Sequence, residues 1–169
     1  MKTIGIVDTT FARVAMGSIA QSTLRSTGGN FRTVRRTVPG IKDLPAAVVQ
    51  LFRQGADLVM ALGMPGKAEY DRTCAHEASQ GLISAAVQEG RPVIEVFVFE
   101  GEARSDKELK LLVRHRTEEH AWNAYRILFH PADLTRSAGT GARQGFADAG
   151  PAGSPSRKRG FRNGIAKYA

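Results

Sequence analysis

The chain has a single cysteine, Cys74, among 169 residues. One thiol cannot form an internal disulfide, and it excludes a metal centre built from several thiolates. No apolar run approaches the roughly 18 residues that a membrane-spanning helix needs. The first residues, MKTIGIVDTTF, also lack the long apolar segment of a secretory signal peptide. We therefore expect a cytoplasmic protein without a membrane partner.

Positive charge is unevenly distributed along the chain. The formal net charge is +8, and residues 151–169 carry five basic side chains and no acidic one, which leaves +3 for residues 1–150. This terminal stretch is rich in Gly, Pro and Ser, a composition typical of disorder. It indicates either a solvated tail or one that contacts RNA or another anion. We expect one domain over residues 1–152, followed by a basic, disordered tail over residues 153–169.

Short apolar runs alternate with helical stripes. The strand candidates are residues 3–8, 31–38, 56–63 and 91–99, and the helix candidates are residues 14–25, 44–54, 74–90 and 106–129. This order predicts an α/β domain with a four-stranded parallel sheet. We expect the most apolar run, residues 56–63, to be central and the run with mixed polarity, residues 31–38, to lie at an edge.

The loops that follow the predicted strands are the most polar and chemically varied parts of the chain. They are residues 8–13, 38–45, 63–71 and 99–106. In parallel sheets, ligands bind beyond the carboxyl ends of the strands, where these connections leave. The sequence therefore predicts a ligand site at this edge of the sheet.

Two of these loops suit a flat, hydroxylated ligand. Phe11 directly follows a buried strand, so its ring either stacks on a heterocycle or packs inward as a core residue. In VPGIKDLP, the backbone of Gly40 and Ile41 lies beside Asp43, and this combination of donors and acceptors suits a polyol. The alternative is that Asp43 only caps the following helix.

Other polar motifs give weaker signals. The loop GMPGKAEYD contains glycines and Lys67 but lacks the spacing of a phosphate-binding Walker A motif. His76 and Glu77 are candidate proton-transfer groups, although adjacent helical residues point about 100° apart. The histidines show no metal-ligand spacing, so no metal site is predicted. In HRTEEH, the pairs His115–Glu119 and Arg116–His120 are four residues apart, which is typical of a solvated or interface-facing surface.

Five segments taken together carry a family resemblance. GIVDTTFARV, TVPGIKDLP, MALGMPGKAEYDRTCAHEAS, VIEVFVFE and RQGFADAGPA resemble, in order, the archaeal-type riboflavin synthases, which are themselves similar to lumazine synthases. The resemblance covers about residues 3–152. It implies a flavodoxin-like three-layer domain and a homopentamer with active sites between neighbouring subunits. It also implies that no organic cofactor is needed and that a divalent ion such as Mg²⁺ can assist the reaction.

The activity implied by this resemblance is a transferase reaction. Two molecules of 6,7-dimethyl-8-ribityllumazine exchange a four-carbon unit, which gives riboflavin and 5-amino-6-ribitylamino-2,4-pyrimidinedione. The 7-methyl group of one lumazine loses a proton, and the carbanion attacks the second molecule. Two alternatives stay open: lumazine synthase itself, and an RNA-associated basic module that uses the tail.

The resemblance also implies roles for individual residues. Phe11 becomes the stacking partner of the pteridine ring, and the turn after Pro39 holds the ribityl chain. The expected substrate contacts are Thr10, Phe11, Gly40, Ile41, Asp43, Gly63, Met64 and Pro65. The expected catalytic groups are His76 and Glu77 for proton transfer and Lys67 for polarising a pteridine carbonyl.

One departure from the lumazine synthases favours one of the two enzymes. Lumazine synthases have a G-x-T-x-H-like segment that supplies a phosphate contact and a general base. The corresponding residues here are Lys67, Ala68, Glu69 and Tyr70, without Thr or His. A site without a phosphate cradle favours the riboflavin synthase reaction, in which neither substrate carries a phosphate.

Overall fold

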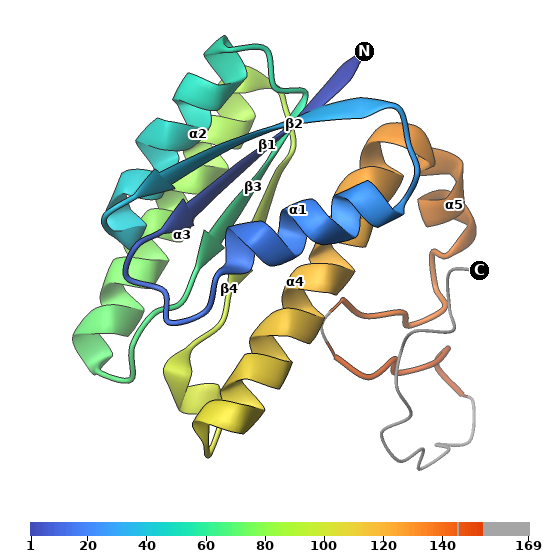
Figure 1. Cartoon of the computed structure of the whole chain (residues 1–169). Coiled ribbons are helices and arrows are strands. Elements are labelled where there is room, and N and C mark those ends of the chain that lie inside the picture. The colour runs from blue at the N-terminus through green and yellow to red at the C-terminus, as the bar shows by residue number, and fades with distance from the viewer. Residues whose placement is uncertain (145, 154–169) are drawn as a thin grey trace.

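Four parallel strands form the centre of the computed structural model, which describes residues 1–144 and 146–153 (Figure 1). The strands are β1 (Lys2–Thr9), β2 (Phe31–Val38), β3 (Leu58–Gly63) and β4 (Val93–Phe97). Their order in the sheet is β2-β1-β3-β4. The predicted parallel α/β sheet is therefore confirmed, with residues 56–63 in a central strand and residues 31–38 at an edge.

Helices cover both faces of the sheet (Figure 1). α1 (Met16–Ser26) and α4 (Asp106–Phe129) pack on one face. α2 (Leu44–Arg53) and α3 (Glu69–Glu89) pack on the other. Two short 3-10 turns, η1 (Ile41–Asp43) and η2 (Glu100–Glu102), precede α2 and α4. The result is a three-layer α/β arrangement.

Burial on both faces explains the continuous apolar runs of the central strands. Ile4 and Ile6 of β1 pack in the layer shared with α1 and α4, whereas Val7 packs in the layer shared with α2 and α3. Successive side chains of a strand point to opposite faces, so a strand covered on both sides has no polar face. No helix in the described part of the chain is both long and apolar enough to cross a membrane.

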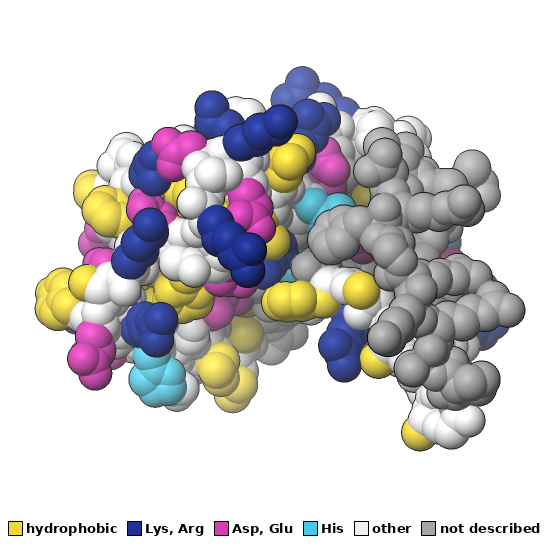
Figure 2. Space-filling view, turned by 90° about the horizontal axis from the view of Figure 1, so that it is seen from below, with side chains coloured by type: hydrophobic (Ala, Val, Ile, Leu, Met, Phe, Trp, Pro, Cys, Tyr) yellow, Lys and Arg dark blue, Asp and Glu magenta, His cyan; other side chains and the backbone are white. Residues whose placement is uncertain are grey.

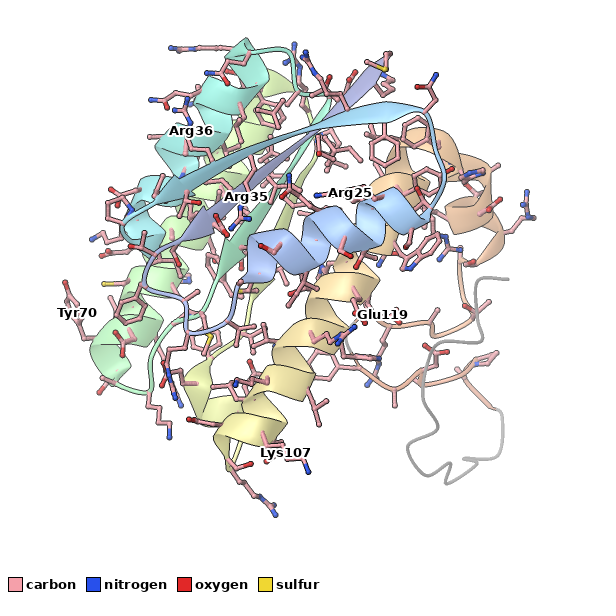
Figure 3. All side chains as sticks on the ribbon, in the orientation of Figure 1. Arg25, Arg35, Arg36, Tyr70, Lys107 and Glu119 are labelled. Atoms are coloured by element: carbon pink, nitrogen blue, oxygen red, sulfur yellow. The ribbon has the colours of Figure 1, made fainter. Side chains whose placement is uncertain are left out.

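The edge strand β2 differs from the central strands because it carries three arginines: Arg32, Arg35 and Arg36. In the described residues it pairs with β1 alone, so its other edge meets no strand. Arg36 donates to the side chain of Gln50 on α2, whereas Arg35 lies between β2 and α1 (Figure 3). The mixed polarity of this segment reflects its position.

Some boundaries differ from the prediction. α3 begins at Glu69 rather than residue 74, because the Asp71 carboxylate accepts from the amide of Ala68 at 3.1 Å and stabilises an earlier first turn. α5 (Pro131–Arg136) was not predicted; it begins at a proline, which suits a first helical position. β4 (Val93–Phe97) is shorter than the strand predicted over residues 91–99.

The chain after α5 folds back towards α4. The Asn123 side chain of α4 donates to Gln144 at 2.7 Å, and the Phe146 ring lies over the Arg116 guanidinium at 4.8 Å. Residues 154–169 lie outside the described residues. The predicted tail and its boundary at residue 153 therefore stay predictions.

Candidate functional site

A narrow hollow of about 240 Å³ lies beyond the carboxyl ends of β1 and β3. It is formed by the loops after β1, β2 and β3 and by the first turns of α3. Its lining residues are Thr9, Phe11, Gly40, Ile41, Lys42, Met64, Pro65, Asp71 and Cys74. Figure 2 shows the molecule from below, with exposed apolar side chains among basic and acidic ones. Five of the eight predicted substrate contacts, namely Phe11, Gly40, Ile41, Met64 and Pro65, thus line one hollow.

Asp8 fixes the point at which the first of these loops leaves the sheet. Its buried carboxylate accepts from Arg35 at 2.5 Å, from the Thr37 hydroxyl at 2.7 Å and from the Gly17 amide at 3.2 Å. These bonds join the end of β1 to β2 and to the start of α1. The Phe11 side chain beyond it is 59% exposed, so the alternative in which Phe11 packs inward is wrong.

The second loop forms a closed turn. The Gly40 amide donates to Asp43 Oδ2 at 2.9 Å, and the Asp43 side chain caps no amide of α2. Asp43 therefore has a capping role, but at the 3-10 turn Ile41–Asp43 rather than at α2. Thr10 ties the first loop to this turn, since its amide donates to Val38 O at 2.9 Å and its hydroxyl to Pro39 O at 3.2 Å. Thr10 and Asp43 hold the loops rather than line the hollow.

Lys42 was not predicted as a site residue, yet it lines the hollow. Its Nζ lies 2.6 Å from Glu77 Oε2 of α3. The hydrogen bond and the charge of Glu77 raise the pKa of Lys42, so the side chain is an ammonium at neutral pH. Next to this pair, a hydrogen bond to Cys74 raises the pKa of Tyr70. A lysine in a loop gives no periodic signal, which is why the sequence did not single it out.

A second, wider hollow also lies at the start of α3. It measures about 580 Å³ and is lined by Lys67, Glu69, Arg72, Thr73 and His76. The structure therefore separates the two predicted proton-transfer groups, because His76 lines this hollow whereas Glu77 pairs with Lys42. Gly63 lines neither hollow, and a Cβ there would lie 2.9 Å from the Phe97 ring.

The interpretation of HRTEEH as a solvated surface is wrong for one of its two pairs. Arg116 is buried and donates to the two carboxylate oxygens of Glu102 in η2 at 2.8 and 2.7 Å. His120 is buried beside it, and burial together with the Arg116 charge lowers the pKa of His120 to about 4. The spacing shows that two side chains share a face of a helix but not whether that face is buried, so the sequence did not reveal this burial. His115 and Glu119, at 3.9 Å, are more exposed.

The Glu102–Arg116 pair braces the loop after β4. Burial alone raises the pKa of Glu102, but the hydrogen bonds from Arg116 and from the Phe99 amide outweigh it and hold the pKa below its usual value. On the other side of this loop, Arg13 contacts Glu100 at 3.3 Å and Asp106 at 2.7 Å. The loops after β1 and β4 are thus joined by ion pairs.

No group of three or more His, Cys, Asp or Glu side chains within residues 1–144 and 146–153 is arranged to hold a metal ion. No step of the chemistry below is assigned to a metal ion.

These features define an α/β protein whose candidate site lies beyond the carboxyl ends of a parallel sheet. The chain belongs to the 6,7-dimethyl-8-ribityllumazine synthase family, whose model matches residues 1–135. The resemblance expected from the loops is confirmed.

The similar proteins include riboflavin synthases and a 6,7-dimethyl-8-ribityllumazine synthase. The chain is 51% identical over 149 residues to the riboflavin synthase of Methanothermobacter thermautotrophicus, a match covering 88% of this chain and 97% of the relative. It is 44% identical over 151 residues to that of Aeropyrum pernix, with 89% and 97% covered. A match to the 6,7-dimethyl-8-ribityllumazine synthase of Kineococcus radiotolerans is 42% identical over 59 residues, or 33% of this chain and 36% of the relative.

The two kinds of match end at different places. Residues 1–135 can hold at most 135 of the 149 matched positions, so at least 14 of them follow residue 135. The similarity to the archaeal riboflavin synthases therefore extends past residue 135, beyond the part of the chain that the family model covers.

Proposed function

We propose that the chain catalyses the riboflavin synthase reaction, in which two molecules of 6,7-dimethyl-8-ribityllumazine give riboflavin and 5-amino-6-ribitylamino-2,4-pyrimidinedione. The observation that carries this proposal is the match to a riboflavin synthase over 97% of the relative's length. The lumazine synthase of Kineococcus radiotolerans is matched over 36% of its length. Lumazine synthesis is therefore the less supported alternative.

The narrow hollow supports this function. We assign the pteridine ring to the exposed ring of Phe11, where stacking contributes roughly 1 kcal/mol. The ribityl chain is assigned to the turn formed by Gly40, Ile41 and Asp43, and Met64 and Pro65 form the apolar wall. Holding two substrates in a reactive orientation supplies up to about 7–11 kcal/mol of the barrier reduction, so alignment is the main contribution of the protein.

The size of the hollow bears on where the second lumazine binds. Pockets for small molecules usually measure about 300–1,000 Å³. At about 240 Å³, the narrow hollow suits one lumazine rather than two. The second molecule is assigned either to the adjoining hollow lined by Lys67 and His76 or to a surface of a neighbouring copy. In the first case, Lys67 and His76 keep their proposed roles in polarising a carbonyl and moving a proton.

We also propose a homopentamer with sites between subunits. In support, α3, whose first turns border both hollows, carries three large exposed apolar side chains along its length: Tyr70 at 74%, Ile83 at 56% and Val87 at 76%. Exposed apolar surface of this kind is typical of protein–protein contacts. Light scattering coupled to size exclusion tests the assembly. A fully active monomer would contradict it.

The decisive assay supplies purified lumazine as the sole substrate. Riboflavin fluorescence is expected to rise, with one riboflavin formed for every two lumazines consumed. A lumazine synthase would instead need the pyrimidinedione and a butanone phosphate, and would give no riboflavin from lumazine alone. Product formation restricted to that second mixture would refute the proposal.

Two further arms of this assay address the remaining expectations. The reaction is proposed to need no organic cofactor, and EDTA followed by added Mg²⁺ measures any contribution of the ion. Deleting residues 153–169 separates the tail from catalysis. We expect full turnover without the tail, and a loss of salt-sensitive RNA binding would show that the tail has a separate partner. A location in the cytoplasm stays a prediction that cell fractionation tests.

A further inference from the structure

The Lys42–Glu77 pair joins the two elements that form the mouth of the narrow hollow. Lys42 belongs to η1, and Glu77 lies two turns into α3. Their side chains are 58% and 51% exposed, so the pair is open to a ligand that enters from solvent. Lys42 is also the one lysine or arginine among the residues that line this hollow. A cation thus lies on the wall of the hollow assigned to the lumazine.

The titratable groups that face the Lys42–Glu77 pair come from α3. Lys42 is faced by Glu77, Tyr70 and Cys74 of α3, and Asp71 of the same helix lines the hollow. Among the ion pairs of the described residues, Glu77 takes part only in the one with Lys42. The pair therefore offers a carboxylate and an ammonium side by side, with a buried thiol and a tyrosine hydroxyl next to them.

The reaction needs both groups in turn. Loss of a proton from the 7-methyl group converts a neutral ring into an anion, whose charge spreads to the oxygens of the pyrimidinedione. A carboxylate can accept the proton, and a cation stabilises the charge that remains. Once the carboxylate is protonated, it no longer neutralises its ammonium partner. The ammonium is then free to pair with the new anion.

We propose that Glu77 and Lys42 form a proton-transfer dyad for the lumazine bound in the narrow hollow, an inference that rests on the proposed function. The C–H bond of the 7-methyl group breaks, and an O–H bond forms on Glu77. The electron pair of the broken bond moves into the ring system, and Lys42 remains protonated beside it. The total charge of dyad and substrate does not change, because one carboxylate charge is replaced by one ring anion.

The test follows the exchange of the 7-methyl protons of lumazine with deuterium by NMR, which reports the first step without product formation. Glu77→Gln is expected to slow exchange by about 10²–10⁴-fold while the Kd for lumazine changes little. Lys42→Met is expected to lower kcat by about 10²-fold. Lys42→Arg is expected to recover most of that loss, because it keeps the charge.

A matched control uses an exposed ion pair remote from the hollow. Arg114 and Glu118 of α4 lie 2.8 Å apart, and Glu118→Gln removes the same charge as Glu77→Gln. Exchange at the wild-type rate in Glu77→Gln as well as Glu118→Gln would overturn the dyad. If the wild-type protein makes riboflavin and both Glu77→Gln and Lys42→Met make it at the same rate, the proposed dyad is wrong but the proposed function stands. If the wild-type protein makes none, the proposed function fails with it.

Discussion

Removing the Arg35 guanidinium is expected to destabilise the protein more than removing a surface cation of similar geometry. In Arg35→Met, the Asp8 carboxylate stays buried and loses a partner at 2.5 Å. Removing one member of a buried pair typically costs about 3–5 kcal/mol. Arg35 is 30% exposed, and Asp8 keeps the Thr37 hydroxyl and the Gly17 amide, so we expect a smaller loss than this, about 2–3 kcal/mol.

Thermal unfolding followed by circular dichroism measures the effect. For a chain of this length, about 1 kcal/mol corresponds to about 2–4 °C, so Arg35→Met should lower Tm by about 4–12 °C. The matched control is Lys2→Met, which removes a cation 2.8 Å from Asp57. That pair is more exposed, at 51% and 30%, and exposed pairs contribute at most about 1 kcal/mol. Equal Tm losses in the two variants would refute the argument that burial of Asp8 makes its ion pair matter.

The remaining predictions concern the ligand site and the core. Phe11→Ala should raise KM for lumazine about 5-fold or more through lost stacking, with Tm unchanged because the ring is 59% exposed, and an unchanged KM would exclude the stacking role. The pKa of His120 is lowered to about 4 in the folded chain. His120 therefore becomes protonated below about pH 6.5 in the unfolded chain, but only near pH 4 in the folded chain. Stability should therefore fall by about 3 kcal/mol as pH drops through this window, and urea unfolding of His120→Leu should lack that slope whereas His130→Gln should keep it. Gly17→Ala should cost about 1–3 kcal/mol in chemical unfolding, because its Cβ would lie 2.7 Å from the Arg35 guanidinium carbon, whereas Gly101→Ala should be neutral with its nearest neighbour at 3.9 Å.

The fold was predictable because each segment carries its own signal. Strands covered on both faces read as unbroken apolar runs, and the alternation of strands with helices leaves few parallel topologies. The start of α3 was missed because Asp71, which stabilises the first turn of this helix, lies in the segment that was interpreted as a loop, residues 63–71. Local sequence patterns therefore predict the presence of helices and strands better than they predict where these elements begin and end.

The site was predictable in part, for a physical reason. The carboxyl ends of parallel strands meet at one edge, so loops distant in sequence had to converge, and Phe11, Ile41 and Met64 do line one hollow. Contacts between side chains of different elements leave no trace in a single sequence. The pair of Lys42 with Glu77 and the burial of Arg116 became visible only in three dimensions.

The arginines of β2 have a consequence for how the protein behaves when it is concentrated. An unpaired strand edge is a template on which another chain can add a strand, and this is a common route to fibres. In β2, any incoming copy of the same strand would bring further guanidinium groups against Arg32 and Arg36. Like-charge repulsion thus opposes self-templated growth at this margin, and replacing these arginines with threonine would convert a soluble preparation into an aggregating one.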